Sequence, residues 1–274
     1  MKRAVVSSMV MGLILCAAAE WAMAVPIASD SFDYPEGLLA GSEGGSGWSH
    51  AWEGGAPEVK VMWTGLEYTD SKDVKLSVAG NSVKTGGLSK REINLDTESR
   101  PELAPFVQNG ILGVDGTTIW ICSLAHMDNN TAWDYIDLRA GGVSKMVMGR
   151  ESTVPNWGLG SFPNVQHEGK TSIEKDVFFV VRIDFKDGDD TVYLWTNPDL
   201  DIEPAVRDAD ITTSRDVEFD SVWLHGCGDD VQFDELRIGT LWKDLIREVE
   251  ANPKGEGKEE EEEEEEVDPP LFIF

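Results

Sequence analysis

The strongest constraint on the fold is a run of alternating apolar residues in the second half of the chain. Every second position there is apolar: Val177, Phe179, Val181, Ile183 and Phe185. A period of two places these side chains on one face of an extended strand, and no helical period competes with it. Asp187-Gly188 then favours a tight turn into a second strand over 191–196. A sheet with such an apolar face needs a second layer to cover it.

Other short alternating segments precede and follow this strand. They cover residues 59–64, 74–78, 88–95, 117–125, 133–140, 143–149, 217–225 and 231–238. Glycine, asparagine and aspartate lie between them, and helical segments do not alternate with them. The pattern predicts an all-β fold, a two-sheet antiparallel jelly-roll sandwich. A closed barrel is the alternative, whereas the lack of a fixed repeat disfavours a propeller.

The two ends of the chain differ from this central domain, which we place at residues 25–240. Residues 1–24 resemble a cleavable secretory signal peptide, with Lys2 and Arg3, an apolar run, and Ala22-Met23-Ala24 as cleavage signal. The apolar run is shorter than the ~20 residues of a membrane span. We therefore expect an exported protein, secreted, periplasmic or at the cell surface. A short helix is expected over 241–252 and a disordered Glu-rich tail over 253–274.

The net charge of the chain limits the kinds of molecule that it is expected to bind. The chain has 51 acidic and 23 basic residues, a formal net charge of −28, and eight of the acids form the Glu259–Glu266 run. Such a negative chain repels the phosphate backbone, so we expect no nucleic-acid partner. No transmembrane span is expected in the mature chain, because its terminal apolar stretch is too short.

Two cysteines, Cys122 and Cys227, remain once the signal peptide is removed. Their alternation places Cys122 in line with Trp120 and Cys227 in line with Trp223 on their own strands. A disulfide between them is allowed if the two strands are neighbours, and an exported protein could keep it oxidised. A pair of free thiols is the other interpretation.

Aromatic residues offer the main hint of a binding surface. Shared faces are expected for Tyr193 with Trp195 and for Trp223 with His225, while Trp120 lies on a third strand. If these faces coincide on one sheet, they form a platform on which sugar rings stack. The competing interpretation, and the more common one, is that these large side chains pack in the core.

We expect the chain to require no cofactor, and calcium is the one metal that its sequence favours as a structural ligand. Asp187, Asp189 and Asp190 cluster in the turn after residue 185 and supply the oxygen ligands that calcium prefers. Aspartate and glycine are also ordinary turn residues, and the spacing does not match an EF-hand loop. The four histidines have no zinc-ligand spacing.

Several motifs resemble a known group of proteins. They span residues 27–37, 44–52, 189–198 and 233–242, and include Ser29-Asp30-Ser31-Phe32 and Phe233-Asp234-Glu235-Leu236-Arg237. The chain resembles exported bacterial proteins with a concanavalin A-like, laminin G-like jelly roll. Many of these end in a PEP-CTERM sorting tail, which this chain replaces with its acidic tail. The resemblance implies the fold more directly than an activity.

The same superfamily includes glycoside hydrolases, which place carboxylates on one strand face. The nearest candidate strand here offers Tyr135, Asp137 and Arg139 at alternate positions, so Asp137 is better explained as the partner of Arg139. Asp234 and Glu235 are expected on opposite strand faces. No Gly-x-Ser-x-Gly nucleophile motif is present.

The sequence therefore favours an exported, non-catalytic binding module for carbohydrate or cell-surface material. One alternative is a structural or adhesive envelope protein that binds another protein through this fold. A polysaccharide-cleaving enzyme is the third hypothesis, and it requires two carboxylates that face each other across a groove.

Overall fold

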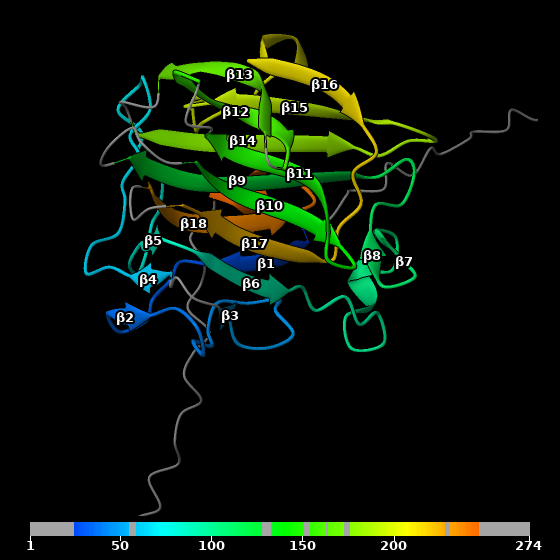
Figure 1. The fold of residues 1–274 in the computed structure, drawn as a ribbon. Helices are drawn as coiled ribbons and strands as arrows, with labels where there is room; N and C mark the ends of the chain where they lie inside the picture. The colour runs from blue at the N-terminus through cyan, green and yellow to red at the C-terminus, as the bar shows by residue number, and fades with distance from the viewer. Residues whose placement is uncertain are drawn as a thin grey trace, which may run out of the picture.

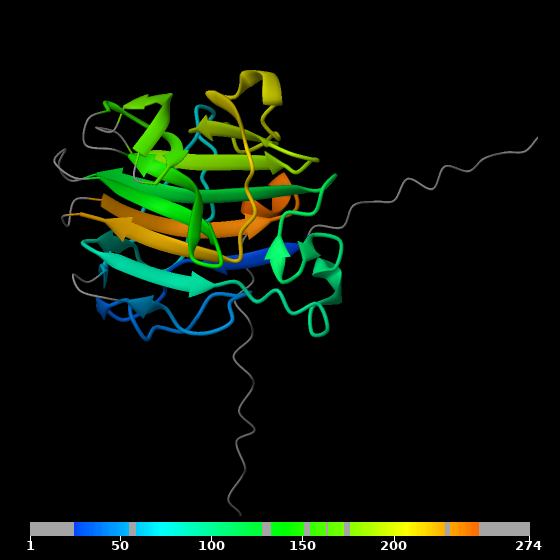
Figure 2. The ribbon, with the colours of Figure 1, turned by 45° about the vertical axis from the view of Figure 1, so that its right-hand side comes forward.

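The computed structural model describes residues 25–54, 59–127, 133–150, 154–162, 164–172, 176–227 and 231–246. Within these ranges two sheets pack face to face, and the paired strands run antiparallel (Figures 1 and 2). One short α-helix, α1 (Trp242–Ile246), and two 3-10 helices, η1 (Pro101–Leu103) and η2 (Val206–Asp208), complete the described elements. The predicted all-β antiparallel sandwich is confirmed.

The larger sheet contains nine of the described strands. They are β1 (Pro26–Asp30), β2 (Gly37–Leu38), β4 (Lys60–Val61), β5 (Val83–Thr85), β9 (Thr118–Met127), β14 (Val177–Asp184), β15 (Asp190–Thr196), β16 (Ile211–Arg215) and β18 (Val231–Gly239). Their order is β16-β15-β14-β9-β18-β5-β4-β2, and β1 pairs with β18. The long strands β9 and β14 carry the most regular pairing, from Val177 opposite Ala125 to Asp184 opposite Thr118.

The second sheet contains seven of the described strands and lies in front in Figure 1. They are β3 (Glu53–Gly54), β6 (Leu88–Glu92), β10 (Asp134–Ala140), β11 (Val143–Arg150), β12 (Asn156–Ser161), β13 (Asn164–Ser172) and β17 (Ser221–Gly226), in the order β13-β12-β11-β10-β17-β6-β3. A separate hairpin pairs β7 (Val107–Gln108) with β8 (Ile111–Leu112) at one end of the sandwich.

The main core fills the space between the two sheets. The nine-stranded sheet contributes Val181 and Ile183 from β14, and the seven-stranded sheet contributes Ile136 from β10 and Leu224 from β17. All four side chains are fully buried. Because strand side chains alternate, the residues between them on β10 and β17 point to the outer face of the seven-stranded sheet.

A second apolar cluster covers the outer face of the nine-stranded sheet. Phe178 and Val180 of β14 pack there with Leu76, Leu200 and Leu245, which come from two covering loops and α1. β14 is therefore buried on both faces, whereas the sequence pattern indicated one. Residues 74–78, predicted as a strand, belong to one of these loops and make only an isolated bridge between Thr69 and Lys75.

The helix expected over 241–252 is present as α1 at residues 242–246, with Trp242 and Leu245 buried. Residues 247–252, the signal peptide at 1–24 and the acidic tail at 253–274 lie outside the described residues, so those predictions stay predictions. Among the described residues, no helix has the length and apolar character needed to cross a bilayer.

A buried ion pair joins β1 of one sheet to β6 of the other. Asp30 Oδ2 and Arg91 Nη1 are 2.7 Å apart, and the two side chains are 1% and 4% exposed. The same carboxylate oxygen accepts hydrogen bonds from the Tyr34 hydroxyl at 2.7 Å and the Trp52 indole at 2.8 Å. The guanidinium also lies over Trp48, 5.2 Å from the ring centroid. These residues of the N-terminal motif stabilise the fold.

A second buried network lies where a bulge interrupts the pairing of β18 with β9. Glu235 has φ +52° there and pairs with Arg237 at 2.6 Å. The Asp234 carboxylate accepts a hydrogen bond from the Leu66 backbone at 2.8 Å, and Glu235 accepts one from Ala79. The prediction that Asp234 and Glu235 face opposite sides is wrong, because the bulge turns both toward the same covering loop.

Asp234 should make the stability of the protein depend on pH. Its pKa is raised to about 9, because burial penalises the charged form and the Glu235 carboxylate repels a second negative charge. The folded state therefore holds a proton that the unfolded state releases above about pH 4. The contribution of Asp234 to the free energy of unfolding therefore falls by about 1.4 kcal/mol per pH unit between about pH 4 and 9. Asp234→Asn should remove this dependence of stability on pH. Urea unfolding of both proteins at about pH 5 to 8 measures it, and parallel pH profiles would contradict it.

Candidate functional site

The outer face of the seven-stranded sheet carries a row of functional side chains on neighbouring strands. Trp223 of β17 lies directly opposite Lys90 of β6 and opposite Asp137 of β10. Glu53 of β3 lies opposite Lys90 and extends the row to the edge of the sheet. Residues directly opposite each other point to the same face, so the register alone brings these four side chains together.

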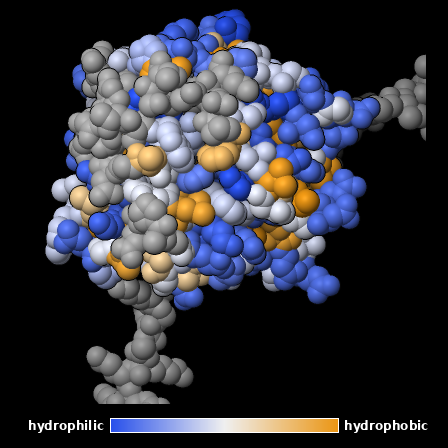
Figure 3. Space-filling view, viewed as in Figure 1, coloured by the Kyte–Doolittle hydropathy of each residue, from blue (hydrophilic) through white to orange (hydrophobic). Residues whose placement is uncertain are grey.

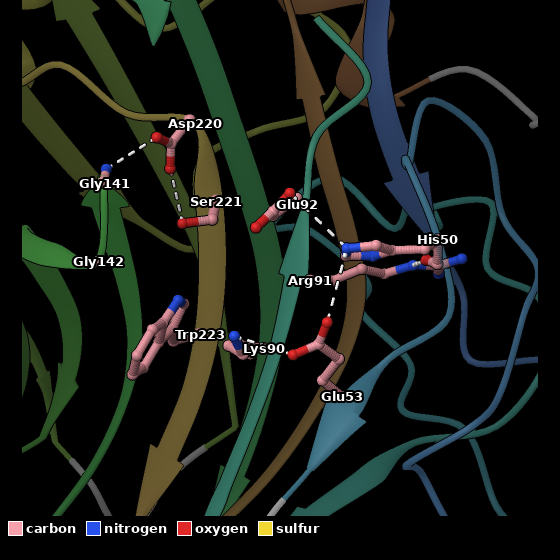
Figure 4. A pocket seen from close by; sticks show the side chains of 10 residues that line it. All are labelled: His50, Glu53, Lys90, Arg91, Glu92, Gly141, Gly142, Asp220, Ser221 and Trp223. Atoms are coloured by element: carbon pink, nitrogen blue, oxygen red, sulfur yellow. Dashed lines mark hydrogen bonds and ion pairs between the residues drawn. The ribbon is translucent and has the colours of Figure 1, made fainter. Parts of the chain in front are cut away.

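A cavity of about 270 Å³ opens on this face between β6 and β17. Its wall contains one aromatic ring, several charged groups and a two-glycine turn: His50, Glu53, Lys90, Arg91, Glu92, Gly141, Gly142, Asp220, Ser221 and Trp223. Figure 4 shows Asp220, Ser221 and Trp223 on one side and Glu53 and His50 on the other, with Lys90 and Glu92 between them. Among the coloured residues, Figure 3 shows polar and apolar side chains mixed on this side of the molecule.

One face of the Trp223 ring is covered by a cation. The Arg139 guanidinium lies 3.9 Å from the ring centroid, in the distance range of a cation–π contact. Arg139 Nε also binds Asp137 Oδ2 at 2.7 Å, and Ser144 donates a hydrogen bond to the same carboxylate. Asp137 is fully buried beneath them, and burial raises its pKa. The predicted Asp137–Arg139 pair is present and fixes the position of Trp223.

A group of aromatic rings continues along the same face. His225, two residues from Trp223, stacks on Phe162 at 4.8 Å and meets the Trp133 edge at 5.0 Å. Trp133 stacks on Tyr135 at 5.5 Å. Burial and the nearby Arg139 lower the pKa of His225, so its imidazole is neutral at pH 7. The face therefore combines flat rings with a small number of charges.

The predicted aromatic platform is divided between two outer faces. Trp223 and His225 lie on the seven-stranded sheet, whereas Trp120, Tyr193 and Trp195 belong to the nine-stranded sheet. Trp120 and Trp195 stack at 5.7 Å and are almost completely buried under α1 and a loop. For these two residues the packing interpretation holds. Alternation gives the face of each strand but not the sheet to which the strand belongs.

The two cysteines are free thiols, so of the two interpretations that the sequence allowed the structure shows the unbridged pair. Cys122 is buried in the cluster outside the nine-stranded sheet, beneath α1, and burial raises its pKa to about 12. Cys227 is exposed and follows β17 in the other sheet. The Cys122 side chain points away from the sheet that carries Cys227, so the two sulfur atoms cannot meet.

The aspartates predicted to hold calcium lie in the turn between β14 and β15. The buried Asp190 carboxylate accepts hydrogen bonds from the backbone N–H groups of Lys186 at 3.0 Å and Val217 at 2.7 Å. Asp187 and Asp189 are exposed. Among the described residues no group of three acidic, histidine or cysteine side chains is arranged to hold a metal. The Asp190 carboxylate thus stabilises the turn through backbone hydrogen bonds, and the calcium site stays a prediction.

Sequence reasoning missed Glu53, Lys90, Glu92 and Asp220. Lys90 and Glu92 lie on a predicted strand, but their role depends on β6 pairing with β17, whose residues are more than 120 positions later. Asp220 immediately precedes β17, and its carboxylate accepts a hydrogen bond from Gly141 at 2.8 Å. The only signal in the sequence is the charged run Lys90-Arg91-Glu92 within a predicted strand, which does not identify a partner strand.

No protein-family model and no curated protein matches the chain. Domain 4 of AbnA, a GH43 extracellular arabinanase from Geobacillus stearothermophilus solved with arabinotriose, has a TM-score of 0.42 and 13% identity over 81% of this chain and 97% of its own. The CBM2 module of the evolved Dit of Lactobacillus casei BL23 phage J-1 has a TM-score of 0.37 and 8% identity, over 79% of this chain and 96% of its own. Trypanosoma rangeli sialidase has a TM-score of 0.38 and 10% identity over 81% of this chain but 32% of its own, so this chain spans about a third of that protein. None of these likenesses is close enough to transfer a function.

Proposed function

We propose that the protein is a non-catalytic carbohydrate-binding module and that the outer face of its seven-stranded sheet is the binding surface. The observation that carries this proposal is the position of Trp223. Its ring lines a cavity whose remaining wall offers carboxylates, an ammonium group and a hydroxyl. Binding sites for small molecules typically combine an apolar surface with a few fixed polar groups in this way.

The chemistry of a sugar ring matches this combination. A pyranose presents C–H groups on its ring faces, which pack on an aromatic ring, and hydroxyls at its rim, which both donate and accept hydrogen bonds. Glu53 and Glu92 accept hydrogen bonds, Lys90 donates them, and the Ser221 hydroxyl does either. Arg139 contacts one face of Trp223 and Lys90 Nζ lies 5.8 Å from the ring centroid, so the ring is held in place before a ligand arrives.

The laminin G-like assignment, the export of the protein and its final location belong to the same proposal. A signal peptide at 1–24 would deliver the domain to a compartment where polysaccharides and cell-surface glycans occur. Secretion, the periplasm and the cell surface are all compatible with a module of this kind. A mature protein that starts at Val25, detected in the culture medium or envelope fraction, is the expected result of cell fractionation.

A polysaccharide-cleaving enzyme is the second candidate, because three carboxylates line the cavity. The hydrogen bond that Lys90 donates to Glu53 at 2.8 Å, together with its positive charge, lowers the pKa of Glu53, which does not suit a general acid. Asp220 binds Ser221 and the Gly141 backbone. We therefore favour binding over cleavage. Release of reducing ends from a polysaccharide that the protein binds would reverse that preference.

A glycan array on residues 25–246, followed by calorimetric titration with the best ligand, tests the proposal. We expect Trp223→Ala to weaken binding about 10- to 30-fold, because central aromatic contacts are worth about 2 kcal/mol in comparable interfaces. Trp63→Ala is the matched control, since Trp63 follows β4 in the other sheet and is 75% exposed. An array without any bound glycan, or equal affinities for the two variants, would contradict the proposal.

A further inference from the structure

The cavity on the seven-stranded sheet holds more negative than positive charge once its ion pairs are taken into account. Lys90 Nζ lies 2.8 Å from Glu53 Oε2, so these two charges compensate each other. Arg91 is compensated from behind by the buried Asp30 at 2.7 Å. Both cations that line the cavity are therefore already paired with carboxylates.

Two further carboxylates, Glu92 and Asp220, are less well compensated within the described part of the chain, because Lys90, which also attracts Glu92, is already paired with Glu53. Glu92 Oε2 lies 3.7 Å from His50 Nε2, and its side chain is 59% exposed. Asp220 accepts hydrogen bonds from the Gly141 backbone and the Ser221 hydroxyl, each at 2.8 Å, and both donors are uncharged. Neither carboxylate forms an ion pair with a lysine or arginine among the described residues.

The two carboxylates lie at the same end of the cavity. Ser221 is directly opposite Glu92 in the pairing of β17 with β6, and Asp220 immediately precedes Ser221. Figure 4 shows both carboxylates above Lys90 and Trp223, on the two strands that border the cavity. Any group placed at this end of the cavity meets negative charge from two neighbouring strands.

Two cations near Trp223 limit where a ligand amine can lie. Arg139 lies 3.9 Å from the ring centroid, and Lys90 Nζ, which lines the cavity, lies 5.8 Å from it. An ammonium group is therefore favoured at the end of the cavity that holds Glu92 and Asp220, where carboxylates attract it, while the ring offers apolar surface to the sugar. The net charge of −28 further raises the local concentration of cationic ligands and lowers that of anionic ones.

We infer that this site prefers glycans with protonated amino groups, that is, polymers of amino sugars whose amines are not acetylated. The ammonium group would lie between Glu92 and Asp220, with the sugar ring against Trp223. This inference rests on the proposed carbohydrate-binding function and names the chemical class of its ligand. Glu92 and Asp220 are the residues that determine specificity.

The test compares two pentasaccharides of the same length and β-1,4 linkage, one of glucosamine and one of N-acetylglucosamine, by calorimetric titration at pH 6. We expect the glucosamine pentamer to bind about 10-fold more tightly at about 0.05 M salt, and this advantage to shrink at about 0.5 M salt, where ion pairs are screened. Glu92→Gln and Asp220→Asn should each reduce the advantage about threefold, because each removes a charge that only the glucosamine pentamer pairs with, so its affinity falls more than that of the acetylated pentamer.

Glu67→Gln removes the same charge from an exposed residue in the loop after β4 and is expected to change neither affinity. Equal or tighter binding of the acetylated pentamer, still sensitive to Trp223→Ala, would overturn the amino-sugar inference and leave the binding function intact. Binding of neither pentamer, together with a blank glycan array, would overturn both.

Discussion

Replacing Arg91 with alanine is expected to lower the free energy of unfolding by about 3–5 kcal/mol, a large part of the stability of a domain of this size. The substitution leaves the Asp30 carboxylate buried without its cation, with only the uncharged donors of Phe32, Tyr34 and Trp52 beside it. It also opens space beside Trp48, whose ring the guanidinium covers. Removing one partner of a buried pair is far more destabilising than removing both.

Urea unfolding of the Arg91→Ala protein measures this loss. Lys90→Ala is the matched control, because Lys90 is the adjacent residue and its pair with Glu53 is half-exposed, so about 0–1 kcal/mol is expected. The double variant Asp30→Ala, Arg91→Ala should be more stable than the sum of the single effects implies. Equal losses at positions 90 and 91, or strictly additive losses at 30 and 91, would refute the buried-pair interpretation.

Replacing Arg237 with alanine is expected to have a similar effect, about 3–5 kcal/mol, at the opposite end of the chain. Arg237 compensates the buried Glu235 at 2.6 Å and donates hydrogen bonds to the carbonyl groups of Leu245 and Ser77. These contacts attach α1 and a covering loop to β18. Their loss leaves the buried Glu235 carboxylate without its cation and removes the guanidinium donor from two carbonyl groups.

Unfolding in urea, combined with hydrogen exchange, tests the Arg237 prediction. The backbone amides of α1 should lose protection in Arg237→Ala, because Leu245 is no longer held by the guanidinium. Arg207→Ala serves as control, since Arg207 is 84% exposed and should change stability by less than about 0.5 kcal/mol. Unchanged protection in α1 would show that Arg237 does not anchor the helix.

Much of the fold could be predicted from local patterns. The alternation over 177–185 marked the central strand β14, and the Asp-Gly turn correctly joined it to β15. The motifs that suggested the family were informative for a structural reason, because Asp30 and Arg237 belong to the buried networks. The bulge at Glu235 could not be predicted, since a positive φ at glutamate is an effect of tertiary contacts.

The candidate site was only partly accessible from sequence. Alternation correctly placed Trp223 and His225 on one face, but it could not separate them from Trp120 and Trp195. That separation depends on which strands become neighbours, and on the loops and helix that cover one outer face. Glu92 and Asp220 meet only because β6 pairs with β17 across a long stretch of sequence.

The central claim is that a glycan binds on the outer face of the seven-stranded sheet, and a crystal structure with the best-binding oligosaccharide tests it most directly. We predict a sugar ring against the cavity-facing side of Trp223, with its polar groups within hydrogen-bond distance of Glu92 and Asp220. An oligosaccharide bound to the loops over the nine-stranded sheet, with the cavity between β6 and β17 empty, would contradict the claim.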